Sequence, residues 1–238
     1  MGRLFVTADI HGSFKDIKQI KKFCKQAETT KDDALIVLGD LGANYWLDER
    51  DHQIKEALQS LPITILAIHG NHEERPSNIS SYQHCISKKY GALWYEYDYP
   101  SIYFLEDGEH IINGKRFLVA SGAYSIDKKY RLATGKKWFA SEQMDDKTKE
   151  RLATLVCRNN SFDYILSHTA PLNYEPRRLF LPMVDQSTVD KSMENYLQWI
   201  YDNIDKETLK KWFLGHYHDD SLLNEKLRLM YNDIIEIE

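Results

Sequence analysis

Side chains that could bind metal ions gather in five short motifs of this chain. In chain order the motifs are Asp9-Ile10-His11, Gly39-Asp40, Gly70-Asn71-His72-Glu73, Ser167-His168 and Gly215-His216-Tyr217-His218. Imidazole and carboxylate ligands together suit manganese, iron, zinc and similar divalent ions. Cysteine is absent from the set, which argues against a closed structural zinc site. The motifs therefore predict a divalent-metal site with nitrogen and oxygen ligands.

Each motif follows an apolar run that is typical of a buried strand. In open α/β sheets, ligands bind beyond the carboxyl ends of the strands, so five such ends can converge on one point. The set exceeds what one ion needs, and two ions about 3.5–4 Å apart could share a carboxylate and hold a bridging hydroxide. Gly39, Gly70 and Gly215 each precede a candidate ligand, and glycine permits a tight turn there.

Each motif also has an ordinary structural explanation when it is taken alone. Asp9 and His11 could be a polar strand end, and Asp40 could belong to a common turn. His168 could be a buried histidine whose hydrogen bonds are satisfied within the fold. The metal site is favoured because all five motifs occur together and each follows a predicted strand.

The elements that must position these motifs alternate between strands and helices in the first half. Short runs rich in Val, Ile and Leu predict strands at 3–8, 34–38 and 64–68. Apolar residues at three- and four-residue spacing predict helices over 14–27 and 51–61. This alternation favours an α/β fold.

The second half is predicted to begin with an antiparallel meander. Its strands lie at 102–105, 110–112 and 116–121, and the hairpin signals Glu106-Asp107-Gly108 and Asn113-Gly114 separate them. The remaining predicted elements are helices near 146–158 and 189–204, strands at 164–167 and 211–214, and a closing hairpin of 227–231 with 234–237. The alternation of Tyr95, Tyr97 and Tyr99 suits an edge strand or an interface, and a buried structural role is the interpretation we favour.

The composition is that of an ordinary globular protein. The 238 residues are 42% hydrophobic and 28% charged, and the net charge is −5. No run approaches the roughly 18 apolar residues of a membrane span, so we expect no membrane partner. The acidic balance argues against a nucleic-acid coat protein. The chain has no repeat or linker, which predicts one domain over 1–238.

The cysteines and the N-terminal residues predict a cytoplasmic location. The chain has three cysteines that lie far apart in the sequence, Cys24, Cys85 and Cys157. This odd number and spacing favour free thiols in a reducing compartment over disulfides. Met1-Gly2-Arg3 runs directly into a predicted strand, without the separate apolar stretch and cleavage site of a secretory signal.

The ordered set of D-x-H, G-D, G-N-H-E, H and G-H-x-H resembles the motif pattern of the calcineurin-like metallophosphoesterases. The resemblance runs from Asp9 to His218, which is nearly the whole chain. It implies a βαββ-type α/β sandwich in which two sheets pack face to face between helices. It also implies an enzyme that hydrolyses phosphoesters by attack of a hydroxide that bridges two divalent ions.

The resemblance assigns a role to each motif position. Asp9, His11 and His218 would hold one ion, and Asp40 would bridge both ions. The second ion would take the remaining predicted ligands, Asn71, His168 and His216. His72 would contact the phosphoester oxygens and protonate the leaving oxygen, which makes it the predicted catalytic residue.

The substrate class is less closely defined, and we expect a small phosphoester or a nucleotide, either mono- or diester. Protein serine/threonine phosphatases of the family continue G-D with Asp-Arg-Gly a few residues on, whereas here the chain reads Gly39-Asp40-Leu41-Gly42-Ala43-Asn44-Tyr45. A nuclease would usually carry an added binding region, for which the length leaves little room. A non-catalytic scaffold of the same fold would lack ligands, and every position is present. These three classes remain the alternatives.

Three arginines are the candidates for substrate binding. The segment 122–142 resembles the pattern G-A-x-S-x-D-x-x-x-R of one bacterial branch, and Arg131 is its arginine. Arg177 and Arg178 follow His168 by nine and ten residues and could bend back to the metals. Charged guanidinium groups bind phosphate well. Each could equally be an ordinary surface residue.

Overall fold

The computed structural model describes residues 2–238, and two β-sheets form its centre. The first sheet has seven strands in the order β13-β1-β2-β3-β6-β5-β4. Its strands are β1 (Leu4–Thr7), β2 (Ala34–Val37), β3 (Thr64–Ala67), β4 (Tyr82–Ser87), β5 (Gly91–Glu96), β6 (Ile102–Leu105) and β13 (Ile235–Glu236). The neighbours β1, β2, β3 and β6 run parallel, whereas β13, β5 and β4 join antiparallel.

The second sheet has six strands in the order β11-β12-β10-β9-β8-β7. They are β7 (Gly108–Ile112), β8 (Lys115–Ala120), β9 (Tyr164–Ser167), β10 (Lys211–Leu214), β11 (Ser221–Leu222) and β12 (Leu227–Leu229). Strands β12, β10, β9 and β8 are parallel neighbours. Each sheet therefore has four parallel strands at its centre.

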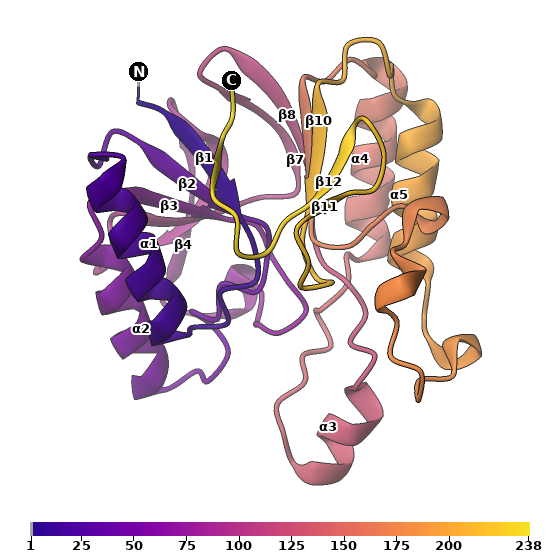
Figure 1. The fold of residues 1–238 in the computed structure, drawn as a ribbon, viewed down its shortest axis with the longest axis horizontal. Coiled ribbons are helices and arrows are strands. Elements are labelled where there is room, and N and C mark those ends of the chain that lie inside the picture. Colours follow the sequence, from indigo (N-terminus) through magenta and orange to yellow (C-terminus); the bar gives the residue numbers. More distant parts are fainter. Residues whose placement is uncertain (1) are drawn as a thin grey trace.

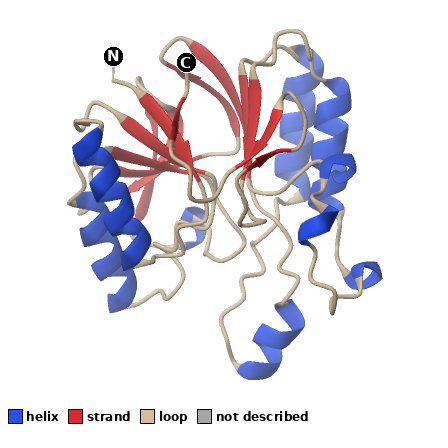
Figure 2. Cartoon of the chain, viewed as in Figure 1, coloured by secondary structure: helices blue, strands red, loops and turns tan. Residues whose placement is uncertain are grey.

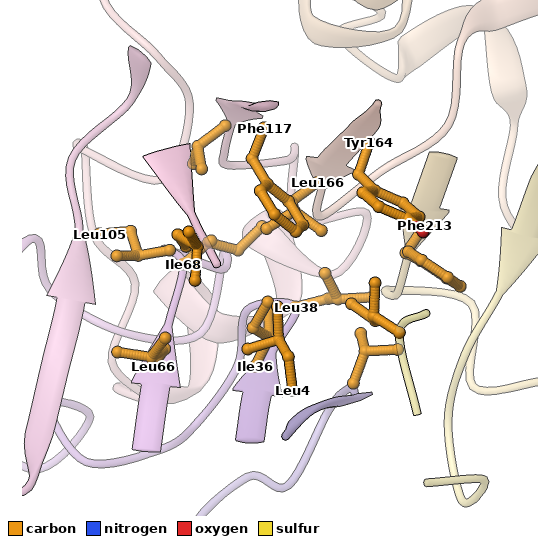
Figure 3. Close-up of a cluster of buried hydrophobic side chains, with 14 of the residues drawn as sticks. Leu4, Ile36, Leu38, Leu66, Ile68, Leu105, Phe117, Tyr164, Leu166 and Phe213 are labelled. Carbon is orange, nitrogen blue, oxygen red and sulfur yellow. The ribbon is translucent and has the colours of Figure 1, made fainter. Parts of the chain in front are cut away.

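Apolar side chains from both sheets fill the space between them. Leu4, Ile36 and Leu66 of the first sheet pack with Phe117 and Phe213 of the second (Figure 3). Burying one such side chain stabilises a fold by about 1.5–3 kcal/mol. The inner faces of the two sheets are thus held together by the hydrophobic effect.

Four helices cover the outer faces of the sheets. Helices α1 (Phe14–Gln26) and α2 (Glu49–Gln59) pack on the first sheet, and α4 (Asp146–Arg158) and α5 (Ser192–Asn203) pack on the second (Figure 1). The predicted two-sheet α/β sandwich flanked by helices is confirmed. None of the helices within residues 2–238 has the length and apolar character needed to cross a lipid bilayer.

A short helix, α3 (Lys128–Thr134), projects away from the sheets at the end of two extended arms (Figure 2). None of its residues is buried. The sequence patterns did not indicate this helix, because a helix without a buried face leaves no apolar periodicity.

Two predicted hairpins are wrong. Glu106-Asp107-Gly108 joins β6 in the first sheet to β7 in the second, and the buried Asp107 carboxylate accepts the Ser121 N–H at 2.7 Å. The closing segments also separate, because β12 pairs with β10 and β13 pairs with β1. The carboxylate of Asp220 accepts three successive backbone N–H groups from residue 231 onward and holds this connection. The Asn113-Gly114 hairpin between β7 and β8 is confirmed.

Other predicted boundaries and roles differ from the structure. Helix α5 begins at Ser192 rather than near 189, because a separate 3-10 turn occupies Gln186–Thr188. The predicted edge strand is also wrong, since β5 lies between β4 and β6 and β4 forms the edge. Tyr99 is buried and Tyr95 is partly buried against the core, whereas Tyr97 is 80% exposed, so the favoured buried role is wrong for Tyr97.

Candidate metal centre

The loops that follow β1, β2, β3, β9 and β10 meet at one end of the sandwich, beyond the carboxyl ends of these strands, and carry all of the predicted ligands (Figure 1). Backbone hydrogen bonds join neighbouring loops directly. The N–H of His11 donates to the Asp40 carbonyl at 2.7 Å, and the N–H of Gly12 donates to the Leu41 carbonyl at 2.9 Å. The convergence of five strand ends is therefore the feature that assembles the site.

Asp9, His11 and His218 form the first group of candidate donors. One ligand atom from each lies within 4.8 Å of the others. His11 Nε2 lies 3.0 Å from His218 Nε2, and His218 Nε2 lies 3.8 Å from Asp9 Oδ1. Asp9 is buried and both histidines are solvent-exposed, so this group lies at the mouth of the site.

Asn71, His168 and His216 form the second group, which is deeper. Asn71 Oδ1 lies 2.9 Å from His168 Nε2 and 3.0 Å from His216 Nδ1. The amide nitrogen of Asn71 donates to Ser125 Oγ at 2.9 Å, which turns its oxygen toward the histidines. His168 is fully buried, and its Nδ1–H donates to the Leu38 carbonyl at 2.7 Å, which leaves Nε2 facing the site.

Asp40 lies between the two groups. Its Oδ2 is 3.8 Å from His11 Nε2 in the first group and 3.5 Å from His168 Nε2 in the second. Its Oδ1 accepts the backbone N–H of His72 at 2.8 Å, which fixes the carboxylate plane. Asp40 also joins Asp9 and His168 in a second cluster of donor atoms within 4.8 Å. One carboxylate thus faces both sets of donors.

Five of the predicted ligands have a left-handed backbone. Their φ angles are 54° at Asp9, 51° at His11, 51° at Asp40, 73° at His216 and 51° at His218. A residue with a Cβ atom adopts this region at a cost of about 1–2 kcal/mol. Such strain persists only where the surroundings over-determine it, and it clusters at functional sites.

Glycine serves the site in two different ways. Gly39 has φ +86°, so the turn before Asp40 requires its backbone freedom as predicted. Gly70 has no such φ, but a Cβ there would lie 2.1 Å from Asp40 Oδ1 and 2.2 Å from the Asp40 nitrogen. Glycine is therefore needed at position 70 because the backbone approaches Asp40 closely, and not because the turn has an unusual φ angle.

Glu73 is not a predicted ligand, but it shapes the ligand loops through its hydrogen bonds. It is fully buried and accepts the N–H of Gly70 at 3.1 Å and the N–H of Gly42 at 3.2 Å. Burial, with Asp40 nearby, raises the pKa of Glu73 to about 8. The sequence motif G-N-H-E contained this residue, but only the structure shows that it ties two loops together.

The electrostatics of the site favour bound cations. Burial, with Asp40 adding to it, raises the pKa of Asp9 to about 8. Burial alone would lower the pKa of His168, but the carboxylates of Asp40 and Asp9 outweigh it and raise that pKa to about 9. Two buried carboxylates side by side thus call for positive charge, and imidazole and carboxylate donors suit divalent ions. The residues fit a pair of such ions.

Comparison with protein families gives a match to the calcineurin-like phosphoesterase family over residues 2–220. The chain belongs to this family. The family supports metal-dependent phosphoester hydrolysis as the general activity, and divalent-metal binding with it. Comparison of the sequence with curated proteins gave no significant match.

One solved structure supports the fold, that of TT1561. This calcineurin-like phosphoesterase is similar to TT1561 of Thermus thermophilus with a TM-score of 0.52 and 11% identity, over 98% of this chain and 91% of that one. It also matches the phosphopantetheinyl hydrolase PptH from Mycobacterium tuberculosis with a TM-score of 0.46 and 15% identity, over 97% and 88% of the two chains.

His72 lies beside the donor groups of this calcineurin-like phosphoesterase. It contacts the projecting segment, which is α3 with its two arms (residues 122–142). His72 Nε2 is 3.4 Å from Nη2 of Arg131, which comes from α3. Burial, reinforced by the positive charge of Arg131, lowers the pKa of His72 to about 4, although Asp40 opposes this. Arg131 is the predicted substrate-binding residue that the fold brings to the site.

Arg177 and Arg178 are not brought to the site in the same way. Both are exposed on a 3-10 turn, Arg177–Leu179, and neither lines the cleft beside the metal ligands. Arg178 forms an ion pair with Asp219, the residue after His218. Arg131 does not line the cleft either, but its Nη2 reaches His72, which does. This contact separates Arg131 from the other two arginines, which the sequence treated alike.

A cleft of about 400 Å³ opens beside the ligands. Asp40, Asn71, His72, His216 and His218 form one end of it. Much of the rest is formed by residues of segment 122–142, which a sequence pattern indicated, and of the chain before α5, which no sequence motif indicated. The calcineurin-like phosphoesterase thus has a substrate-sized space directly at its candidate metal centre.

Proposed function

We propose that this chain is a two-metal hydrolase of small phosphoesters, mono- or diesters, with nucleotides included. The observation that carries the proposal is the position of Asp40, whose Oδ2 lies 3.8 Å and 3.5 Å from a histidine nitrogen in each of the two donor groups. A single carboxylate between two sets of N and O donors is suited to a pair of manganese, iron, zinc or similar ions.

The ligands would divide as the motif pattern implies. Asp9, His11 and His218 would hold one ion, and Asn71 would hold the other together with the two remaining histidines, His168 and His216. The ions, when bound, would lower the pKa of a water between them and neutralise charge on the phosphoryl oxygens. The hydrogen bonds of His168 and Asn71 support the proposed division, because each orients one donor atom into the site.

The remaining steps belong to side chains. In the hydrolysis, a water oxygen forms a bond to phosphorus, the bond from phosphorus to the leaving oxygen breaks, and that oxygen receives a proton. His72 is the proposed donor of this proton and a hydrogen-bond partner of the ester. Arg131 Nη2, 3.4 Å from His72 Nε2, is the proposed partner of a phosphoryl oxygen. A phosphoryl dianion beside His72 would raise its pKa and favour the protonated form.

We infer a cytoplasmic location from the cysteines. Within residues 2–238, Cys24, Cys85 and Cys157 are all free, and Cys157 is exposed. Free thiols of this kind are typical of a reducing compartment. Fractionation of cells that express the chain would test this inference.

The central test combines metal analysis with hydrolysis. The chain reconstituted with Mn²⁺ is expected to hydrolyse nitrophenyl mono- or diesters and to lose that activity in chelator. Asp40→Asn is expected to lower metal content and abolish nearly all activity. Asp98→Asn, on an exposed turn remote from the ligands, is the matched control and should behave as the original chain does. Full activity of the original chain at zero metal content would overturn the proposal.

A further inference from the structure

The cleft extends beyond the metal ligands between two segments that are distant in sequence. Tyr124, Ile126 and Asp127 come from the arm that leads to α3, and Phe180 and Val189 come from the chain between β9 and α5. These residues lie on the side of the cleft where the organic group of a bound phosphoester would extend. They are therefore the residues that would distinguish one ester from another.

Apolar side chains surround the mouth of this part of the cleft. Ile126 is 39% exposed and Leu181 is 57% exposed, and both line the cleft although they come from different segments. Phe180 lies farther in and stacks on Tyr217 with a ring-centroid distance of 6.4 Å and an interplanar angle of 18°. Exposed apolar side chains that gather around a concave site mark a surface for apolar ligands.

The charged groups of the cleft already have partners or carry the wrong sign for a second phosphate. The ammonium of Lys191 lies 2.5 Å from a Glu175 oxygen. Arg131 does not line the cleft, and its Nε lies 2.8 Å from an oxygen of Asp127, which does. Glu194 adds a further acidic group that is only 3% exposed. Among the described residues that line the cleft, no unpaired lysine or arginine remains to bind another anionic group.

We propose that this part of the cleft binds the organic group of the ester, and that this group is neutral and apolar or aromatic. The inference rests on the proposed function and narrows its substrate class. It excludes as good substrates those esters whose organic group carries a second phosphate. Each methylene that enters the apolar space should raise kcat/KM about fourfold, which is the transfer preference of one buried CH₂ group.

The experiment uses alkyl phosphates of one leaving-group chemistry. Ethyl, butyl and hexyl phosphate differ in apolar length, and 1,6-hexanediol bisphosphate adds a second phosphate to the longest chain. Each is assayed with the Mn²⁺-reconstituted chain as the monoester and as the methyl diester. We expect kcat/KM to rise at least tenfold from ethyl to hexyl, and to fall at least tenfold from hexyl phosphate to the bisphosphate.

Variants connect the preference to the cleft. Phe180→Ala should flatten the dependence on chain length, and Val189→Lys should improve the bisphosphate relative to hexyl phosphate by supplying a free cation. Met183→Ala is the control, because Met183 is 97% exposed and does not line the cleft. It should retain the full dependence on chain length.

Two failures can be told apart. If nitrophenyl esters are hydrolysed but ethyl, hexyl and bisphosphate substrates give equal kcat/KM, the inference about the organic group is wrong and the proposed function stands. A bisphosphate preferred over hexyl phosphate would also overturn it. If no ester of any kind is hydrolysed with any of the metals, the proposed function is wrong and this inference falls with it.

Discussion

Replacing Arg131 with alanine is expected to lower kcat/KM by about 10–150-fold. The Arg131 side chain is only 14% exposed, and two nitrogens of its guanidinium already have protein partners. Nε contacts both oxygens of Asp127 at 2.8 Å, and Nη1 donates to the Tyr45 hydroxyl at 3.1 Å and to the Lys137 carbonyl at 3.2 Å. Nη2 alone points toward His72.

One nitrogen therefore remains for a phosphoryl oxygen, and the expected loss is that of one charge-assisted hydrogen bond. Such a bond contributes about 1.5–3 kcal/mol, which corresponds to the stated range. A bidentate contact through Nη1 as well would require Arg131 to leave Tyr45. A loss much greater than about 150-fold would thus indicate that the segment moves when substrate binds.

The assay is kcat/KM with the Mn²⁺-reconstituted chain on the best ester found. Arg177→Ala is the matched control, because the Arg177 side chain is exposed, whereas the Arg131 side chain is 14% exposed and reaches His72. Tyr45→Phe removes a hydroxyl that accepts from Arg131 while keeping the guanidinium, so it measures the anchoring of the segment separately. Unchanged kcat/KM for Arg131→Ala, or an equal loss for Arg177→Ala, would refute the reasoning.

Three further expectations follow from contacts in the structure. Gly70→Ala should reduce metal content at least tenfold, because the added Cβ would displace Asp40. The control is Gly114→Ala, whose Cβ meets no atom within 4 Å, so this variant should retain metal. Equal metal content in the two variants would contradict this expectation. His72→Ala should retain metal and lose about 10²–10⁴-fold more rate on an alkyl ester than on a nitrophenyl ester, and equal losses would exclude proton donation. Burial of Asp33 opposes its ionisation, but hydrogen bonds from Arg3 and Thr30 outweigh burial and lower its pKa. The contribution of ionised Asp33 to the stability of the fold is therefore complete above about pH 4 and is lost as the pH falls below it. Asp33→Asn should therefore lower Tm at neutral pH but hardly in strong acid. An equal loss of Tm at both pH values would contradict the lowered pKa of Asp33.

The metal motifs could be predicted from the sequence because each is local. A polar ligand directly after a run such as Leu4–Thr7 or Thr64–Ala67 stands at the carboxyl end of a parallel strand wherever that strand lies in the sheet. The convergence of the loops then follows from the architecture, without knowledge of any single contact. The α/β class follows from local patterns in the same way, whereas the two-sheet sandwich was predicted only from the resemblance to the calcineurin-like metallophosphoesterases.

The wrong hairpins failed because pairing between strands is not local. Glu106-Asp107-Gly108 has the composition of a turn, but Asp107 is bound by Ser121 and by Arg75 from other parts of the chain. The hairpin of β4 and β5 was missed for a related reason. Strand β4 is an edge strand with several exposed residues, so its sequence lacks the apolar run that marks the central strands.

The cleft walls could not be predicted because they depend on contacts between segments far apart in the sequence. Ile126 and Leu181 are separated by more than fifty residues, and each alone is an ordinary exposed apolar residue. Arg131 could not be separated from Arg177 on residue type. Only the positions of the projecting segment and of the chain before α5 distinguish a residue at the site from one on the surface.

The left-handed backbone of the predicted ligands shows how the fold supports the site. A left-handed backbone costs a residue with a Cβ atom up to about 1–2 kcal/mol, and five of the predicted ligands have one. The loops hold this strain against one another: His11 donates to the Asp40 carbonyl, and the N–H of His216 donates to the Asp9 carboxylate at 2.9 Å. Each ligand is thus fixed by a neighbouring ligand loop as well as by its own strand. Donor atoms fixed in this way keep their directions without reorganisation when charge develops on a substrate, which is the condition for strong electrostatic stabilisation.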